Sequence, residues 1–157
     1  MHKYVIGFAL LLISGTSALA QETNTRFGAL TVNDDKMLLF KGHPLNPPIQ
    51  GNNSLDVGKP YQIGATDVVL VTDNGGTACP FLYYFVTISA SGAKSSPLFG
   101  TCAEVTRVKR TGDSISVYMP GFEGPFESQR KQLRAAREKH VFIFRAGVVT
   151  ENGKRVK

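Results

Sequence analysis

The sequence predicts an all-β protein, mainly antiparallel and arranged as a meander, a sandwich or a barrel-like sheet, with one short C-terminal surface helix. Short apolar or alternating segments recur every 8–12 residues or so with turn residues between them, as in antiparallel β-domains. Only residues 128–139 combine strong helix formers with no internal Gly or Pro. These two observations set the fold class.

The first twenty residues predict a secretory signal peptide. Lys3 gives a basic start, residues 4–13 are apolar, and Ala18 and Ala20 have the spacing of a cleavage site. We expect cleavage after Ala20, which leaves residues 21–157 as a single β-rich domain that is periplasmic or secreted. The apolar run is shorter than a membrane span. No transmembrane span is expected in the mature chain, because no second run of that kind follows.

In the remaining N-terminal part, residues 27–32 and 36–41 predict a hairpin around Asn33–Asp35, since Asn and Asp tolerate turn conformations. Residues 42–48 contain three prolines, which exclude a helix or a central strand and predict a connection along a sheet edge. Two further short strands are expected, one around Leu55 and Val57 and one at residues 61–63.

Residues 67–72 and 81–89 predict the central hairpin of the fold. The first segment is apolar at successive positions, which suits a strand covered on both faces. Asn74-Gly75 between the two strands is a strong signal for a tight hairpin turn. Thr77 and Ala78 lengthen the connection, so the register stays open.

Cys79 and Cys102 are the only cysteines of the chain. In an exported protein, two cysteines predict a disulfide between them. Closing a loop of about 24 residues stabilises the fold by about 3 kcal/mol on the chain-entropy model. The alternative is a redox-active or nucleophilic cysteine, but there is no C-x-x-C pair and no histidine nearby.

The C-terminal part adds strands at residues 104–110, 114–119, 141–144 and 148–150. The strand at 114–119 alternates clearly, with Ile115, Val117 and Met119 on one face. Across the strongest strands, the residues expected in the core are Val69, Val71, Phe85, Ile88, Val117, Phe142 and Phe144.

The expected helix, residues 128–139, is mostly polar and belongs on the surface, with Ser128 as its cap. It carries a basic cluster that we interpret as a partner-binding surface: Arg130, Lys131, Arg134 and Arg137. Positions 130, 134 and 137 recur at helical spacing and share one face. The alternative is a solvated helix face with no partner.

The formal net charge is +6 for the whole chain, and it falls to about +5 when Lys3 leaves with the signal peptide. A mild basic excess favours anionic partners, such as phospholipid, lipopolysaccharide or an acidic protein. Export argues against nucleic acid as the partner.

No recognisable catalytic, metal-binding or cofactor-binding set is present in the sequence. His43 and His140 are the only histidines after the leader, and no G-x-S-x-G elbow occurs. Asp73 to Gly76 resembles part of a calcium loop but lacks the distal Glu, so a turn is preferred. The aromatics of residues 82–85, with Phe122 and Phe126, are assigned to core packing rather than to a ligand pocket.

The leading functional hypothesis is therefore a non-enzymatic exported β-module that binds or inhibits a macromolecular partner, through its basic helix. The alternative is a carrier that holds a small ligand in an apolar pocket inside a β-barrel. An envelope enzyme with an unrecognised site is the third hypothesis.

Overall fold

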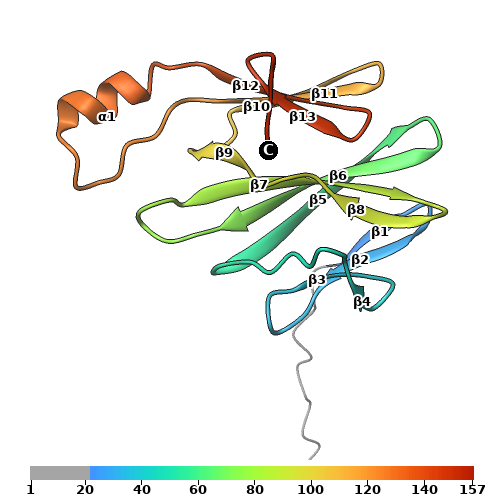
Figure 1. Cartoon of the computed structure of the whole chain (residues 1–157). Coiled ribbons are helices and arrows are strands. Elements are labelled where there is room, and N and C mark those ends of the chain that lie inside the picture. The colour runs from blue at the N-terminus through green and yellow to red at the C-terminus, as the bar shows by residue number, and fades with distance from the viewer. Residues whose placement is uncertain (1–21) are drawn as a thin grey trace, which may run out of the picture.

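The computed structural model describes residues 22–157, so the predicted signal peptide lies outside the described residues. These residues form three antiparallel sheets and one short helix (Figure 1). The predicted fold class is confirmed. No helix in this part of the chain has the length and apolar character that crossing a membrane requires.

The first sheet, called the first layer below, contains four strands paired in chain order. Its strands are β1 (Glu22–Thr25), β2 (Gly28–Val32), β3 (Leu38–Phe40) and β4 (His43–Pro44). The predicted hairpin is β2–β3, with Leu30 opposite Phe40. The short proline-containing strand β4 lies at the sheet edge, where a residue without an N–H costs no ladder bond.

The central sheet is built on long strands. They are β5 (Ser54–Ile63), β6 (Thr66–Asn74), β7 (Phe81–Ser89), β8 (Gly92–Ser95) and β9 (Phe99–Cys102). The order is β5-β6-β7-β8, and β9 also pairs with β7. Two expectations are corrected here. The two short strands expected before residue 64 form one strand, β5, whose register shifts between Val57 and Pro60.

The second correction concerns the Asn74-Gly75 turn. Asn74 is still part of β6 and pairs with Phe81, so the connection is long, as Thr77 and Ala78 predict, but Asn74-Gly75 does not form the turn. The loop is closed by a hydrogen bond from the Gly75 N–H to the Pro80 carbonyl, at 2.7 Å. Gly75 does not have the positive φ that a type I′ turn demands.

The third sheet, called the third layer, follows in chain order. Its strands are β10 (Arg107–Thr111), β11 (Ser114–Met119), β12 (His140–Arg145), β13 (Val148–Glu151) and β14 (Lys154–Arg155). The central sheet lies between the first and third layers (Figure 1). β6 and β7 are thereby covered on both faces, as the sequence predicts for residues 67–72.

Two separate cores result, one on each face of the central sheet. The core toward the first layer is aliphatic and contains Leu30, Leu38, Leu45, Ile49, Leu55, Val57, Val69, Val71, Val86 and Ile88. The core toward the third layer contains Val68, Tyr83, Phe85, Phe99, Ile115, Val117, Met119, Phe142, Phe144 and Val149. All seven residues expected in the core are buried. Neighbouring residues of β6 enter opposite cores because successive strand side chains alternate.

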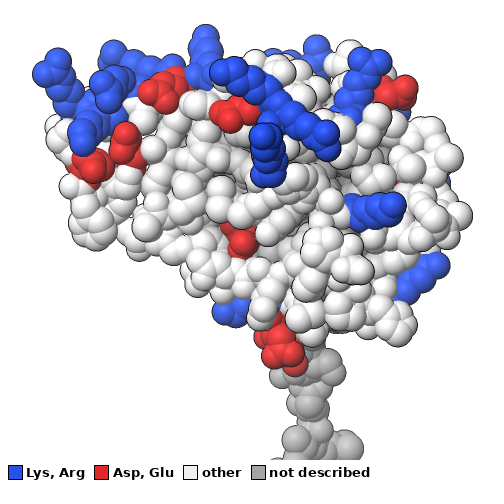
Figure 2. Space-filling view, in the orientation of Figure 1, with Lys and Arg blue, Asp and Glu red and all other residues white. Residues whose placement is uncertain are grey.

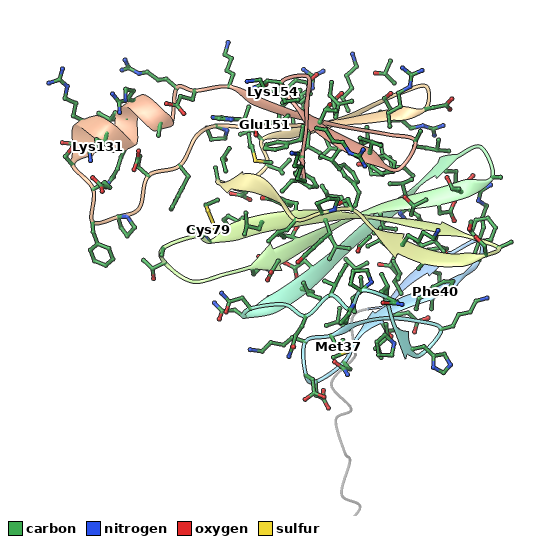
Figure 3. The ribbon with its side chains drawn as sticks, viewed as in Figure 1. Met37, Phe40, Cys79, Lys131, Glu151 and Lys154 are labelled. Carbon is green, nitrogen blue, oxygen red and sulfur yellow. A yellow bond between two sulfur atoms is a disulfide. The ribbon has the colours of Figure 1, made fainter. Side chains whose placement is uncertain are left out.

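The disulfide between Cys79 and Cys102 is present, with 4.7 Å between the two Cα atoms. Cys79 lies in the loop between β6 and β7 (Figure 3), and Cys102 ends β9. The bridge therefore fastens that loop to the strand from which the chain crosses to the third layer.

Helix α1 spans Gln129–Ala135 and is shorter than expected. It ends early because the next N–H groups, of Arg137 and Glu138, bond to carbonyls only three residues back. Ser128 occupies the N-cap position but makes no side-chain cap hydrogen bond, which corrects its predicted role.

Candidate functional site

Residues 120–139, called the arm below, connect β11 to β12 and contain α1. The arm projects to one side, beyond the stacked sheets (Figure 1). Met119 and His140, which flank it, are register partners in adjacent strands. The chain therefore leaves the third layer and returns to it at the same place.

The base of the arm is closely packed. The Gly121 N–H donates to the Ala135 carbonyl at 3.0 Å, and Ala135 is the one buried residue of α1. The Thr101 hydroxyl donates to the Pro120 carbonyl at 2.6 Å. A Cβ at position 121 would lie 2.9 Å from the Ala135 carbonyl oxygen, a backbone atom, so the base has no room for a side chain there.

His140 joins the end of the arm to the sheet. Its Nδ1 lies 2.8 Å from a Glu151 carboxylate oxygen, and its Nε2 lies 3.3 Å from one of Glu138. The hydrogen bond to Glu151 is the main cause that raises the pKa of His140 above its usual value, and the bond to Glu138 adds to it. His140 therefore links β13 to the arm most strongly when it is protonated.

The outer part of the arm is held by side chains of the helix. The Gln132 amide lies 2.8 Å from the Glu127 carbonyl and 3.3 Å from the Gly124 carbonyl, and it donates to both. Lys131, labelled in Figure 3, forms an ion pair with Glu127 at 2.7 Å. That bond raises the pKa of Lys131. The loop before the helix is thus folded onto it.

The structure brings the four predicted basic residues together on the arm, all exposed. With Leu133 and Gln129 they border a surface hollow of about 640 Å³. Lys131 is neutralised by Glu127. Among residues 22–157, Arg130, Arg134 and Arg137 have no carboxylate within ion-pair distance. Three guanidinium groups therefore remain without a partner on one side of the arm.

The third layer extends this basic surface. Tyr118, Ser116 and Thr150 alternate with buried residues of their strands and so point away from the core. Residues opposite each other on neighbouring strands share a face, so the residues paired with these three also point outward. These positions hold Arg107, Lys109 and Arg155. The guanidinium of Arg107 lies 5.6 Å from the centre of the Tyr118 ring.

Positive charge is segregated along the chain. Residues 103–157 hold twelve Lys and Arg against six Asp and Glu, whereas residues 22–102 hold five against six. Figure 2 shows the Lys and Arg side chains gathered over the arm and the third layer. The two N-terminal sheets contribute no net positive charge.

Two exposed apolar side chains of the arm were not anticipated. Phe126 is 93% exposed, which corrects its assignment to core packing, and Leu133 is 53% exposed. The signal in the sequence was the setting of Phe126, between Pro125 and Glu127 and away from any strand pattern. A Phe in a Gly/Pro-rich loop has no periodic neighbours with which to be buried.

A cleft of about 760 Å³ lies between the central sheet and the third layer, at the end with the β5–β6, β7–β8 and β12–β13 turns. Ile63, Val68 and Phe144 give it apolar walls, and Lys94 and Arg145 also line it. It is open between two sheets rather than enclosed in a barrel.

Among residues 22–157, no three His, Cys, Asp or Glu side chains gather into a group that could hold a metal ion. The Asp73 carboxylate accepts a hydrogen bond from the Asn52 N–H at 2.8 Å and so anchors a neighbouring loop. His43 is exposed in the edge strand β4.

Comparison with family models, with curated proteins and with solved structures finds no match to this chain.

Proposed function

We propose that the protein is an exported, non-enzymatic binding module whose arm and third layer dock onto an anionic macromolecular partner of the cell envelope. The observation that carries the proposal is the segregation of charge. All of the net positive charge of residues 22–157 resides in residues 103–157, where three arginines of the arm have no acidic partner.

Stability offers little reason for such a cluster. Exposed ion pairs contribute at most about 1 kcal/mol, and unpaired like charges repel one another. A one-sided positive field instead speeds the encounter with an anionic partner and orients the protein toward it. The disulfide fits an oxidising compartment, as does the predicted export.

The test compares two triple variants that remove equal charge. Arg130→Gln/Arg134→Gln/Arg137→Gln neutralises the arm, and Lys41→Gln/Lys59→Gln/Lys94→Gln neutralises exposed cations outside it. Binding to immobilised lipopolysaccharide, to anionic phospholipid vesicles and to an acidic protein is measured at low and high salt. We expect weaker binding and a flatter salt dependence for the arm variant alone. Equal loss in both variants, or no loss in either, contradicts the proposal.

The second candidate function is a small-ligand carrier, for which the cleft between the central sheet and the third layer is the supporting observation. Its apolar walls and its excess of positive charge, Lys94 and Arg145 against Asp113, suit a small amphiphile with an anionic group. Native mass spectrometry of the protein as purified separates the two functions, because a carrier retains a ligand and a docking module does not.

A further inference from the structure

The exposed apolar side chains of the arm stand out from the rest of the surface. In residues 22–157 only three large apolar residues are exposed, namely Phe126 at 93%, Leu133 at 53% and Leu98 at 38%. Two of the three belong to the arm, and the most exposed is an aromatic ring. Single exposed apolar residues are common, but a nearly bare Phe on a projecting segment is not.

This exposure is built into the arm. Gln132 bonds the carbonyls on both sides of Phe126, at Pro125 and Glu127, with distances of 3.4 and 2.8 Å. The ion pair between Lys131 and Glu127 closes the same turn. The backbone of residue 126 is thus fixed against the helix while its ring points into solvent.

The charges around Leu133 complete the pattern. Leu133 lies among Arg130, Arg134 and Arg137, with which it borders one hollow. Segments that lie in a membrane interface combine Lys and Arg with exposed Trp, Phe or Leu side chains, and the arm has this combination. Anionic lipid headgroups accept the guanidinium groups, while the acyl boundary below them accepts a ring and an isobutyl group.

We propose that the arm inserts into the surface of an anionic phospholipid bilayer, with Phe126 and Leu133 at the acyl boundary and Arg130, Arg134 and Arg137 at the headgroups. The inference rests on the proposed function and names its partner. Each basic residue near an anionic membrane strengthens binding about fivefold. Burial of the two apolar side chains adds about a further tenfold or more.

The absence of Trp from the whole sequence makes insertion directly measurable. Phe126→Trp places one fluorophore on the arm, and Leu98→Trp is the matched control outside it. On vesicles of phosphatidylglycerol and phosphatidylcholine, we expect a blue shift and quenching by brominated acyl chains for Phe126→Trp only. Vesicles of phosphatidylcholine alone should produce neither signal.

Affinity is tested in parallel by co-sedimentation with the same vesicles. We expect Phe126→Ser/Leu133→Ser to weaken binding about tenfold or more, Leu98→Ser to leave it unchanged, and the triple Arg→Gln variant to weaken it about a hundredfold. If the arginine variant loses binding but the apolar variant and the fluorescence show no effect, insertion is wrong and electrostatic docking stands.

Two other outcomes also decide the matter. If the parent protein ignores anionic vesicles but binds lipopolysaccharide or an acidic protein through the three arginines, the lipid partner is wrong and the proposed function stands. If no probe distinguishes the arginine variant from its parent, both proposals fail.

Discussion

The two faces of the central sheet are packed by different chemistry. Toward the first layer the core is aliphatic, and its aromatic neighbours Phe27, Phe40 and Tyr84 are only partly buried at its margin. Toward the third layer Phe85 stacks on Phe99 and meets Phe144, with ring centroids 5.2 and 4.8 Å apart. β6 and β7 contribute to both cores, because successive side chains of a strand point to opposite faces of the sheet.

The outer layers differ in a parallel way. The third layer combines the aromatic core with most of the basic residues and carries the arm, whereas the first layer has neither feature. Aromatic rings bury large areas and add specific contacts between rings. The layer that presents the charge is therefore also the one held by the bulkiest side chains.

Phe142→Ala should cause the largest loss. Phe142 is buried and its ring lies 5.1 Å from that of Phe99, so truncation removes an aromatic contact and leaves a cavity. We expect the free energy of unfolding to fall by about 3–5 kcal/mol, measured by urea denaturation. Leu38→Ala in the aliphatic core is the comparison, at about 2–5 kcal/mol. A loss below about 1 kcal/mol for Phe142→Ala would contradict the packing of the third layer.

Arg26→Ala tests how the first layer is tied to the central sheet. Asp67 is only 1% exposed and accepts bonds from both the backbone N–H and the side-chain Nε of Arg26, each at 2.7 Å. Removing the guanidinium leaves a buried carboxylate with its backbone donor alone. We expect a loss of about 2–3 kcal/mol, less than for a fully buried pair because Arg26 is partly exposed.

The corresponding contact with the connection from β9 to the third layer is made by Tyr83. Its hydroxyl donates to the Ala103 carbonyl at 3.2 Å and accepts from the Val105 N–H at 3.1 Å. Tyr83→Phe serves as the control for the ionic tie and should cost only about 1–2 kcal/mol. Should Tyr83→Phe prove the more damaging of the two, the buried charge at Asp67 is better solvated than its exposure indicates.

His140→Gln should have the smallest effect, and one that depends on pH. The folded-state pKa of His140 is raised, so its stabilising contribution is complete below about pH 6.5 and is lost as pH rises through the folded-state pKa. We expect the variant to be less stable than its parent by under about 1 kcal/mol at pH 5.5, and to match it at pH 9. Thermal melts at both pH values check this. An equal difference at the two values would mean that packing, not charge, accounts for the effect.

Much of the fold could be predicted from the sequence where a pattern was regular. Apolar residues at successive positions of 67–72 indicated a strand covered on both faces, and β6 is one. The strand 114–119 was placed by its alternation alone, and β11 has the same bounds. The division into three sheets could not be predicted, because alternation gives the face of a side chain and not the sheet that covers it.

In the candidate site, too, local features could be predicted and features that depend on the fold could not. Helical spacing predicted that Arg130, Arg134 and Arg137 share a helix face. Arg137 lies beyond the end of α1, but all three border one hollow. The exposure of Phe126 was missed although its position outside any strand pattern was a local signal. The bonds from Gln132 to three carbonyls around it depend on the fold and could not be predicted. The predicted Asn74-Gly75 turn was wrong because β6 continues through Asn74, and the loop closes between Gly75 and Pro80 instead.

The single point at which the arm leaves and rejoins the third layer has a consequence for how this protein can vary. Met119 and His140 face each other across one rung of the β11–β12 ladder, a separation that a short hairpin turn also spans. Segments of different lengths can therefore connect β11 to β12 without a change in the register of these two strands. Chains with the same three sheets could carry another insert at this rung, and with it another partner, while their two cores stay the same.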